Sequence, residues 1–475
     1  MDALAFEHHL TSPQGHAHVP AAAFTAEVGG GVCCDTVSIS LSTDGQRITD
    51  AGFTAHGCGA ANAAGSAAVA LVRGCSLLDA ARIGPTQVAE ELGGLSPGKR
   101  HAADVAAEAL ARALGAAARA SGALPGEHGR TLVAMSGGVD SAVAAWLCAQ
   151  EGETVAVTLE LWADPENDSE RSCCSASAVA QARGLAHRMG LPHFTIDLRT
   201  EFRAGVVEPF IAGYAQGETP NPCVGCNGHV RLDAMIALAD RLGCRHLATG
   251  HYARLKDGLL RTAADPAKDQ TYMLSALSRE SLARMRFPLG ELTKPEVRRI
   301  ASAAGLSVAG KPDSQDLCFL AGTSRARFLE RHGGISRRPG HVVDQRGNVL
   351  AAHDGHERFT VGQRRGTGVA SGDAQFVLEK DAALNRVVVG PRAALLTREV
   401  TVRGVRLHDE GARVDRVKLR YRSQALPARL SQDAPAGHHR MLKLELDEPM
   451  AGAAPGQLAC LMDGELVVGW AVIAS

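Results

Sequence analysis

A serine- and glycine-rich turn at 136–141 (SGGVDS) carries the residue types that bind phosphate groups. It follows an apolar run at 131–135 and precedes an alanine-rich helical pattern at 142–150. Its two glycines allow a tight turn that brings backbone N–H groups close to a ligand, and its serine hydroxyls lie at the positive end of the following helix. The order of strand, loop and helix therefore predicts a cradle for an anionic ligand.

The turn lacks the lysine of the G-x-x-x-x-G-K-[ST] loop, which argues against a kinase or a GTPase. It resembles instead the PP-loop of ATP pyrophosphatases, which split ATP into AMP and pyrophosphate and so activate a carbonyl as an adenylate. This resemblance implies ATP as a cofactor. A glycine-rich turn with another purpose is the competing interpretation.

Five further motifs follow this turn in the sequence. They are TPNPCVGCN (219–227), ATGHYAR (248–254), KDQTY (268–272), KPDSQDLCF (311–319) and GQRRGTG (362–368). With the turn, this ordered set resembles the MnmA family of tRNA-uridine 2-sulfurtransferases over about residues 130–475. The resemblance implies an enzyme that thiolates C2 of the wobble uridine of tRNA.

A uridine C2 carbonyl is a poor electrophile, so in this family ATP first converts its oxygen into an adenylate leaving group, and sulfur then displaces AMP. The later cysteine accepts a persulfide, and the earlier one acts as nucleophile, releasing hydrosulfide or closing a disulfide. By position, the resemblance assigns these roles to Cys318 and Cys226 respectively. Thiolates of this kind need a low pKa, which nearby cations or a helix N-terminus supply.

The same resemblance assigns the remaining site residues. The pyrophosphate would contact Ser136, Gly137, Gly138, Val139, Asp140 and Ser141, and Asp140 would also organise Mg²⁺. Leu159 and Gly250 would lie beside adenosine. The tRNA would contact Asn221, Cys223, His251, Lys268, Asp269, Gln270, Arg420, Tyr421 and Gln457. Phosphates of the anticodon stem-loop would fix the register without reading bases, and the wobble base must leave its stack. From the residues alone, His251 is an ordinary loop histidine.

Cys223 departs from the family pattern, in which many members carry aspartate three residues before the nucleophile. A carboxylate is therefore missing, and a C-x-x-C appears in its place. With Cys318, the chain offers three thiolates, which is a known way for sulfur-transfer enzymes to hold a four-iron four-sulfur cluster with one open iron. In that case Cys226 and Cys318 are cluster ligands. A zinc site and a reversible disulfide are the competing interpretations, and Cys173 and Cys174 have no assigned role.

The N-terminal part carries a second set of metal-ligating residue types. The motifs GVCCD (31–35), AHGCGA (55–60) and GKRHAAD (98–104) resemble the iron–sulfur scaffold proteins of the IscU/NifU type over about residues 25–120. By position, the resemblance assigns cluster ligation or release to Cys33, Asp35, Cys58 and His101.

The third cysteine of the scaffold family is missing from this chain, because the residue after His101 is Ala102. Three interpretations remain open: Cys34 or Cys75 compensates, the domain docks a cysteine desulfurase and relays sulfur, or it has lost ligation and is structural. Dimerisation through this domain is a further expectation.

Periodicity and turn residues predict an α/β protein of four domains. Residues 1–124 would form a self-contained α+β scaffold domain, and residues 125–335 a PP-loop domain with a doubly wound parallel sheet, similar to adenine nucleotide alpha hydrolases. Short strands with turns predict a small central domain at 336–397, to which the resemblance to the MnmA family assigns tRNA contacts, and a C-terminal β-barrel at 398–475. An exposed linker is expected at 121–129, and ligands belong at the carboxyl ends of the parallel strands.

Composition narrows the class of protein. Fifty lysine and arginine residues nearly balance 51 acidic residues, so any nucleic-acid surface must be a local patch. No apolar span is long enough for a bilayer, and the first thirty residues lack a signal pattern, which predicts a cytoplasmic protein. Twelve cysteines then indicate thiolate chemistry or metal ligation, although Cys148, Cys244 and Cys460 lie in apolar contexts and are expected to be buried.

Two other functions compete with tRNA thiolation. One is another PP-loop enzyme that activates a carboxylate for amidation, against which the cysteines argue. The other is an iron–sulfur carrier with a vestigial nucleotide domain, against which the intact phosphate cradle argues.

Overall fold

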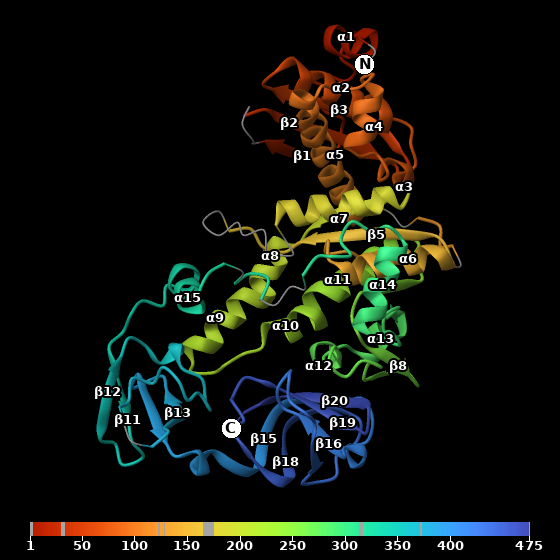
Figure 1. Cartoon of the computed structure of the whole chain (residues 1–475). Coiled ribbons are helices and arrows are strands. Elements are labelled where there is room, and N and C mark those ends of the chain that lie inside the picture. The colour runs from red at the N-terminus through yellow and green to blue at the C-terminus, as the bar shows by residue number, and fades with distance from the viewer. Residues whose placement is uncertain are drawn as a thin grey trace.

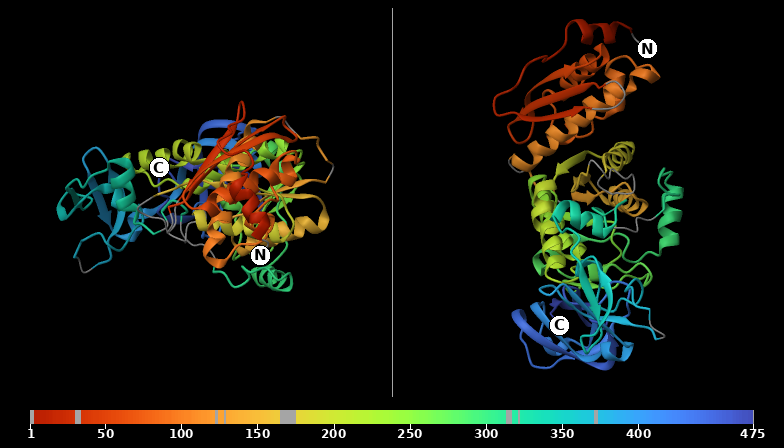
Figure 2. Two further views of the ribbon diagram at one scale, coloured as in Figure 1. Left: turned by 90° about the horizontal axis from the view of Figure 1, so that it is seen from above. Right: turned by 90° about the vertical axis from the view of Figure 1, so that its left-hand side faces the viewer.

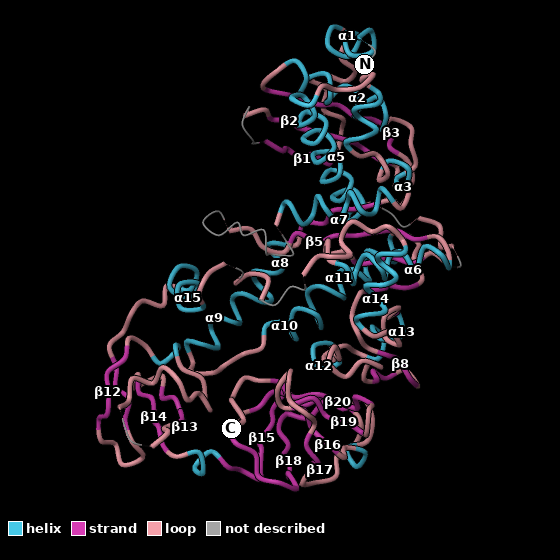
Figure 3. The backbone as a smooth tube through the Cα atoms, in the orientation of Figure 1, coloured by secondary structure: helices cyan, strands magenta, loops and turns pink. Residues whose placement is uncertain are grey.

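The computed structural model describes residues 3–29, 34–121, 124–127, 129–164, 175–312, 317–320, 322–370 and 373–474. The chain is elongated, with the N-terminal part at one end, a parallel sheet in the middle and two β-rich parts at the other end (Figure 1). Helices are concentrated in the first two of these regions, and the strands of the last third lie together (Figure 3). No described helix is long and apolar enough to cross a membrane.

The N-terminal part packs helices against a three-stranded antiparallel sheet in the order β1-β2-β3. Small residues allow close packing: a Cβ on Gly65 would lie 2.3 Å from the Phe53 ring, so the helix lies directly on the sheet. The elements are α1 (Ala3–Thr11), β1 (Phe24–Gly29), β2 (Thr36–Thr43), β3 (Ile48–His56), α2 (Gly59–Val72), α3 (Leu77–Ala80), α4 (Pro85–Glu91), η1 (Pro97–Lys99) and α5 (Arg100–Ala120).

The middle part is a five-stranded parallel sheet in the order β10-β7-β4-β5-β6. Every residue of β4 (Thr131–Ala134) and β5 (Thr154–Glu160) is buried, as expected of parallel strands covered on both faces. The other strands are β6 (His193–Asp197), β7 (His246–Thr249) and β10 (Met285–Arg286). The predicted doubly wound sheet is confirmed, and its switch point lies at β4, between β5 and β7.

The helices of this part connect the strands and cover the sheet. They are α6 (Val139–Glu151), α7 (Ala176–Arg188), α8 (Arg199–Phe202), η2 (Arg203–Val207), α9 (Glu208–Ala215), α10 (Pro222–Gly225), η3 (Cys226–Arg231), α11 (Leu232–Arg241), α12 (Thr271–Leu274), α13 (Arg279–Arg284), α14 (Lys294–Ala303) and α15 (Arg325–Gly333). Two of them, η2 and η3, are π-helical. Such wide turns are frequent at functional sites.

The N-terminal part is docked on the edge strand of the parallel sheet. A Cβ on Gly115 of α5 would lie 1.9 Å from the Thr195 carbonyl oxygen of β6, so the missing side chain lets the helix reach the strand. Arg112 of α5 donates to Glu160 at 2.7 Å, and the apolar core runs without a break across the junction. The expected self-contained domain thus shares its core with the next one (Figure 2).

The last third contains two β structures. A four-stranded sheet has the order β12-β11-β14-β13, and a closed barrel is completed by pairing between β15 and β20. The strands and short helices are β11 (Gly340–Val343), β12 (Val349–His353), η4 (His356–Arg358), β13 (Phe376–Asp381), β14 (Arg386–Gly390), η5 (Arg392–Leu395), β15 (Leu396–Leu407), η6 (Gly411–Arg413), β16 (Arg416–Lys418), β17 (Leu426–Leu430), β18 (Gly437–Ala451), β19 (Leu458–Asp463) and β20 (Leu466–Ile473).

The predicted barrel is confirmed. Its sheet also includes two strands from an earlier part of the chain, which the sequence did not predict. The hairpin of β8 (Arg254–Lys256) and β9 (Leu259–Arg261), which precedes the barrel by more than a hundred residues, extends its sheet beside β20. The barrel is therefore attached to the nucleotide-binding part by backbone pairing.

Candidate functional site

The serine- and glycine-rich turn connects β4 to α6 at the switch point of the sheet. The Ser141 hydroxyl accepts a hydrogen bond from the Ser136 amide at 3.1 Å and donates to the Gly138 carbonyl at 3.2 Å, which closes the loop on itself. Gly137 has φ +70°, where a side chain is strained. The loop is thus preformed, with its amides at the N-terminus of a 13-residue helix.

Gly250 packs directly against this loop. A Cβ at this position would lie 2.7 Å from the Ser141 amide nitrogen and 2.8 Å from the Asp140 carbonyl carbon, and both atoms belong to the backbone. A glycine is therefore required after β7, and the structure brings Gly250, which the resemblance assigned to adenosine, against the backbone of the phosphate loop.

Two lysines that the sequence did not assign approach the loop. Lys294 at the start of α14 donates to both carboxylate oxygens of Asp140, at 2.7 and 2.8 Å, and Tyr252 donates to the same carboxylate at 2.9 Å. Lys311 donates to the Gly137 carbonyl at 3.0 Å. These cations suit a pyrophosphate. Asp140 as folded is not arranged to hold Mg²⁺, because Lys294 already contacts both of its oxygens.

A pocket that is partly open to solvent lies beside the loop. Ser136 and Leu159 line it, as do Met235 and Arg231 from the helices that follow the C-x-x-C. An apolar wall with a few polar groups suits a purine. Leu159, which the resemblance assigned to adenosine, lines this cavity.

Cys223 lies in α10, and Cys226 begins the next helical segment, η3. The Asn221 side chain caps α10 by accepting from the Cys223 amide at 3.2 Å. Cys226 is buried and begins η3, the π-helical segment whose last residue, Arg231, lines the cavity. The helical segment η3 therefore carries Cys226 at its start and a residue that lines the nucleotide cavity at its end.

Cys318 is positioned by an aromatic cluster in a chain whose aromatic content is only 4%. Its neighbour Phe319 is 2% exposed and makes ring contacts with Phe210 at 5.2 Å, Phe328 at 5.1 Å and Phe202 at 5.9 Å. The segment 317–320 is therefore anchored between α8, α9 and α15, with Cys318 half-buried on it.

Among the described residues, one group of three metal-ligating side chains has its ligand atoms within 4.8 Å of one another. It consists of Asp35, Cys58 and His101. Cys223, Cys226 and Cys318 do not form such a set, so as folded they do not fit a single zinc ion. A spacing within 4.8 Å is required only of ligands that share one ion, whereas a four-iron cluster binds each cysteine through a different iron.

The Asp35 set lies where α2 and α5 begin. Asp35 is 1% exposed, the Cys58 thiol donates to its carboxylate at 3.1 Å, and His101 Nε2 lies 3.0 Å from the same oxygen. Burial opposes ionisation, but the hydrogen bonds from Cys58 and His101 outweigh it and lower the pKa of Asp35. A carboxylate, a thiol and an imidazole that converge in this way fit a metal or a cluster.

The other cysteines predicted for the scaffold site lie in different places. Cys33 lies outside the described residues, as do Cys173 and Cys174 of the neighbouring part. Cys34 is exposed beside Asp35. Cys75 lies beyond the opposite end of the 14-residue α2, about 20 Å along the helix from Cys58, and its thiol donates to the Leu71 carbonyl at 3.1 Å. Cys75 therefore cannot complete this set.

The predicted tRNA contacts fall into two groups, and the first lies around Tyr252. Gln270 accepts from the Tyr252 amide at 2.9 Å, and Asp269 accepts from the Thr271 hydroxyl at 2.9 Å. Both side chains therefore shape the loop. Burial, and then the charge of Arg231, lower the pKa of His251 to about 3, so its imidazole is neutral near pH 7.

The second group belongs to the barrel. Arg420 donates to the Gly452 carbonyl, and Gln457 donates to the Thr219 carbonyl. Burial raises the pKa of Tyr421, and the nearby Cys223 thiolate adds to the rise. Gln457 and Tyr421 thus lie near the segment that carries the C-x-x-C.

Comparison with known proteins identifies the parts in the same order. The NifU-like N terminal domain matches residues 6–121, the tRNA methyl transferase HUP domain 129–322, the tRNA methyl transferase PRC-barrel domain 326–391 and the Aminomethyltransferase beta-barrel domain 400–473. The Bifunctional protein NifU/MnmA of Rubrobacter xylanophilus is 42% identical over 482 residues, covering 98% of this chain and 97% of that protein. The chain belongs to the bifunctional NifU/MnmA family.

Relatives with MnmA names match the larger part of this NifU/MnmA chain. The tRNA-specific 2-thiouridylase MnmA of Rhodospirillum rubrum is 43% identical, covering 70% of this chain and 92% of the relative. The protein of the same name from Clostridioides difficile is 35% identical, covering 72% of this chain and 98% of the relative.

Sequence reasoning missed Lys294 and Tyr252 in this NifU/MnmA chain. A weak signal existed for a third missed residue, Lys311, because it begins the motif that ends in Phe319. The expectation for Cys148, Cys244 and Cys460 is confirmed, since all three are buried.

Proposed function

We propose that this chain catalyses the ATP-dependent 2-thiolation of the wobble uridine of tRNA in the cytoplasm. The observation that supports it most is the 43% identity to a tRNA-specific 2-thiouridylase over 92% of that enzyme. Two of the matched domain families are named for methyl transfer, whereas the relatives are named for thiolation. The C-x-x-C, whose second cysteine begins the helical segment that reaches the nucleotide cavity, favours thiolation.

ATP supplies AMP as the leaving group on uridine C2. The amides of the loop at 136–141 would hold the pyrophosphate, assisted by Lys294 and Lys311, while Leu159 and Met235 would exclude water from the purine. These residues bind and orient the nucleotide. The tRNA would lie across the barrel and the four-stranded sheet.

The sulfur step can be written with the thiols of this chain. A persulfide on Cys318 is attacked at its inner sulfur by the Cys226 thiolate, which closes a Cys226–Cys318 disulfide and releases hydrosulfide. Hydrosulfide adds to C2, and the C2–O bond breaks as AMP leaves. An external dithiol then reduces the disulfide. We propose this relay for the chain, with a cysteine desulfurase or the N-terminal part as the sulfur source.

The reaction is tested by mass spectrometry of tRNA from a deletion strain. We expect 2-thiouridine to disappear and to return with the wild-type gene but not with Cys226→Ser. Unchanged 2-thiouridine in a strain without a paralogue would contradict the proposal.

The sulfur route needs a separate experiment. Anaerobic purification of the wild type and of Cys223→Ala, followed by iron and sulfide analysis, separates the relay from a cluster held by Cys223, Cys226 and Cys318. The relay predicts thiolation by iron-free protein. Activity that requires iron, and that is lost with iron in Cys223→Ala, would favour the cluster instead.

A further inference from the structure

Two residues just before the C-x-x-C are held by both β structures of the last third. Lys380 of β13 donates to the Glu218 carbonyl at 3.2 Å and to the Thr219 hydroxyl at 3.4 Å. From the barrel side, Arg403 pairs with the Glu218 carboxylate at 2.6 Å, and Gln457 donates to the Thr219 carbonyl. We call Glu218 and Thr219 the junction.

Lys380 is half-buried, and protein groups surround its ammonium group. Burial lowers its pKa to about 8, and its ammonium group lies 5.8 Å from the centre of the Tyr214 ring of α9. Its third acceptor is the Phe359 carbonyl at 3.2 Å. One side chain therefore connects the four-stranded sheet to α9 and to the junction.

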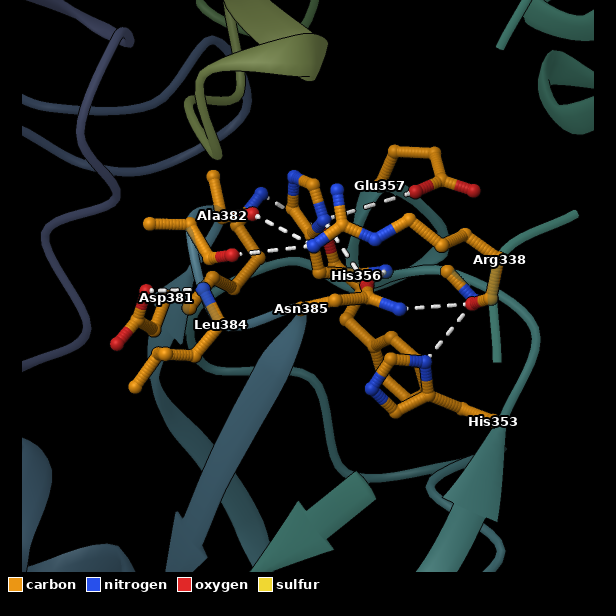
Figure 4. A network of polar contacts seen from close by, with 12 residues as sticks. Arg338, His353, His356, Glu357, Asp381, Ala382, Leu384 and Asn385 are labelled. Carbon is orange, nitrogen blue, oxygen red and sulfur yellow. Dashed lines mark hydrogen bonds and ion pairs between the residues drawn. The ribbon is translucent and has the colours of Figure 1, made fainter. Parts of the chain in front are cut away.

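A network of hydrogen bonds holds the turn after Lys380, as Figure 4 shows. Asn385 is 3% exposed, donates to the Arg338 carbonyl at 2.7 Å and accepts from the His356 amide at 3.0 Å. The turn touches the residue before the junction, because a Cβ on Gly217 would lie 3.6 Å from the Ala382 side chain. Lys380 is thus fixed to its own sheet and cannot yield independently of it.

The path from the junction to the thiols is short and stiff. Thr219 is followed by Pro220, Asn221 and Pro222, and the next residue is Cys223. Prolines fix φ, and the Asn221 cap ties the segment to the Cys223 amide. Four residues span at most about 14 Å. A displacement of the junction is therefore passed on to Cys223 and Cys226.

We propose that Lys380 is a positioning residue that couples tRNA engagement by the four-stranded sheet and the barrel to the placement of Cys223 and Cys226. This inference rests on the proposed function, since it assumes that tRNA lies on those two parts. Lys380 acts through the junction and does not itself touch RNA. Its loss uncouples the thiols from tRNA while leaving RNA binding in place.

The test uses the full chain with Lys380→Met, Lys380→Arg and the control Arg338→Met. Arg338 donates to the Ala383 carbonyl at 3.1 Å in the same turn but has no bond to the junction. With saturating tRNA, we expect Lys380→Met to lower kcat for thiolation about tenfold or more, because small misplacements of reacting groups are costly. We expect Kd for tRNA to change less than about threefold, Lys380→Arg to recover part of kcat, and Arg338→Met to remain near wild type.

A second readout does not depend on turnover. The rate at which iodoacetamide alkylates Cys226, followed by mass spectrometry, should change when tRNA is added to the wild type and should not change in Lys380→Met. If Lys380→Met folds poorly, Thr219→Val can replace it, because this change removes only the hydroxyl that accepts from Lys380. We expect the alkylation rate of Cys226 in Thr219→Val to be unchanged by tRNA as well.

Three outcomes would overturn the inference: wild-type kcat in Lys380→Met, a loss of tRNA affinity that matches the loss of kcat, or a tRNA response of Cys226 that survives the substitution. A wild type that binds tRNA but forms no 2-thiouridine would instead contradict the proposed function, and the alkylation rates would still decide the role of Lys380.

Discussion

The cysteines of this chain differ in reactivity because their burial differs. Burial raises the pKa of Cys148 to about 11 and those of Cys244 and Cys460 to about 12, whereas Cys34 is exposed. A thiol with a pKa this high is almost entirely protonated at neutral pH and is a poor nucleophile. Cys148, Cys244 and Cys460 are therefore structural, whereas Cys226, which is also buried, belongs to the C-x-x-C.

Brief alkylation with iodoacetamide at pH 8 should label Cys34 and leave Cys148, Cys244 and Cys460 unmodified in the folded protein. Peptide mass spectrometry measures the labelled fraction at each site. In urea all four should react, which serves as the control. Labelling of the three buried thiols at the rate of Cys34 would show that their surroundings open to solvent.

Gly250→Ala tests the packing at the phosphate loop. The added Cβ would meet backbone atoms of Ser141 and Asp140 at less than 3.0 Å, so the loop has to move. We expect ATP affinity to fall by about tenfold or more, at a cost in unfolding free energy of about 1–3 kcal/mol. Isothermal titration and urea unfolding measure the two effects.

Gly126→Ala is the matched control for Gly250→Ala, because a Cβ at Gly126 meets no atom within 4 Å. This variant should bind ATP like the wild type. If Gly250→Ala does so too, the contact is not needed to shape the cradle.

At the scale of elements, the sequence predicted the strands and loops that have a clear local pattern of residues. Apolar runs indicated the parallel strands, and the phosphate loop followed from the glycines and serines between strand and helix. The β8–β9 hairpin was not predicted, because each of its strands has three residues and too little periodicity to detect. Lys294 was not predicted to contact Asp140, since 154 residues separate the two and topology alone brings them together.

The segment that carries Cys318 depends on the aromatic cluster below it. Phe319→Ala removes a buried ring that contacts three phenylalanines, and such truncations cost about 3–5 kcal/mol. Because the cluster lies under Cys318 and not under the phosphate loop, we expect thiolation to fall far more than ATP affinity. Phe319→Leu keeps most of the volume and should be close to wild type. Equal losses of ATP affinity and thiolation in Phe319→Ala would indicate general unfolding instead.

At the scale of the whole molecule, α5 packs on two sheets that share one apolar core. One face of this helix packs on β1 and β2, and another packs on β6 through Gly115. The sequence of α5 could not show that a second sheet covers it, because its many alanines are compatible with both helix surface and close packing. The exposed boundary expected at 121–129 is correspondingly partial: Leu124 is buried and its amide donates to the Arg241 carbonyl at 2.7 Å.

This shared core predicts that the N-terminal part and the parallel sheet unfold together. Gly115→Ala separates the two, because its Cβ would lie 1.9 Å from the Thr195 carbonyl oxygen and α5 must move away from β6. In helix propensity alone the same change favours α5 by about 1 kcal/mol. We therefore expect calorimetry of the full chain to show one transition for both parts in the wild type and two in Gly115→Ala, although the helix itself is strengthened.

Ala116→Gly, on the exposed side of α5, supplies the opposite perturbation. It weakens the helix by about 1 kcal/mol without touching β6, so it should lower the temperature of the joint transition and leave it single. Comparing Gly115→Ala with Ala116→Gly therefore separates the effect of helix stability from the effect of packing between α5 and β6. If Ala116→Gly splits the transition and Gly115→Ala does not, the strength of α5 and not its close approach to β6 couples the N-terminal part to the sheet.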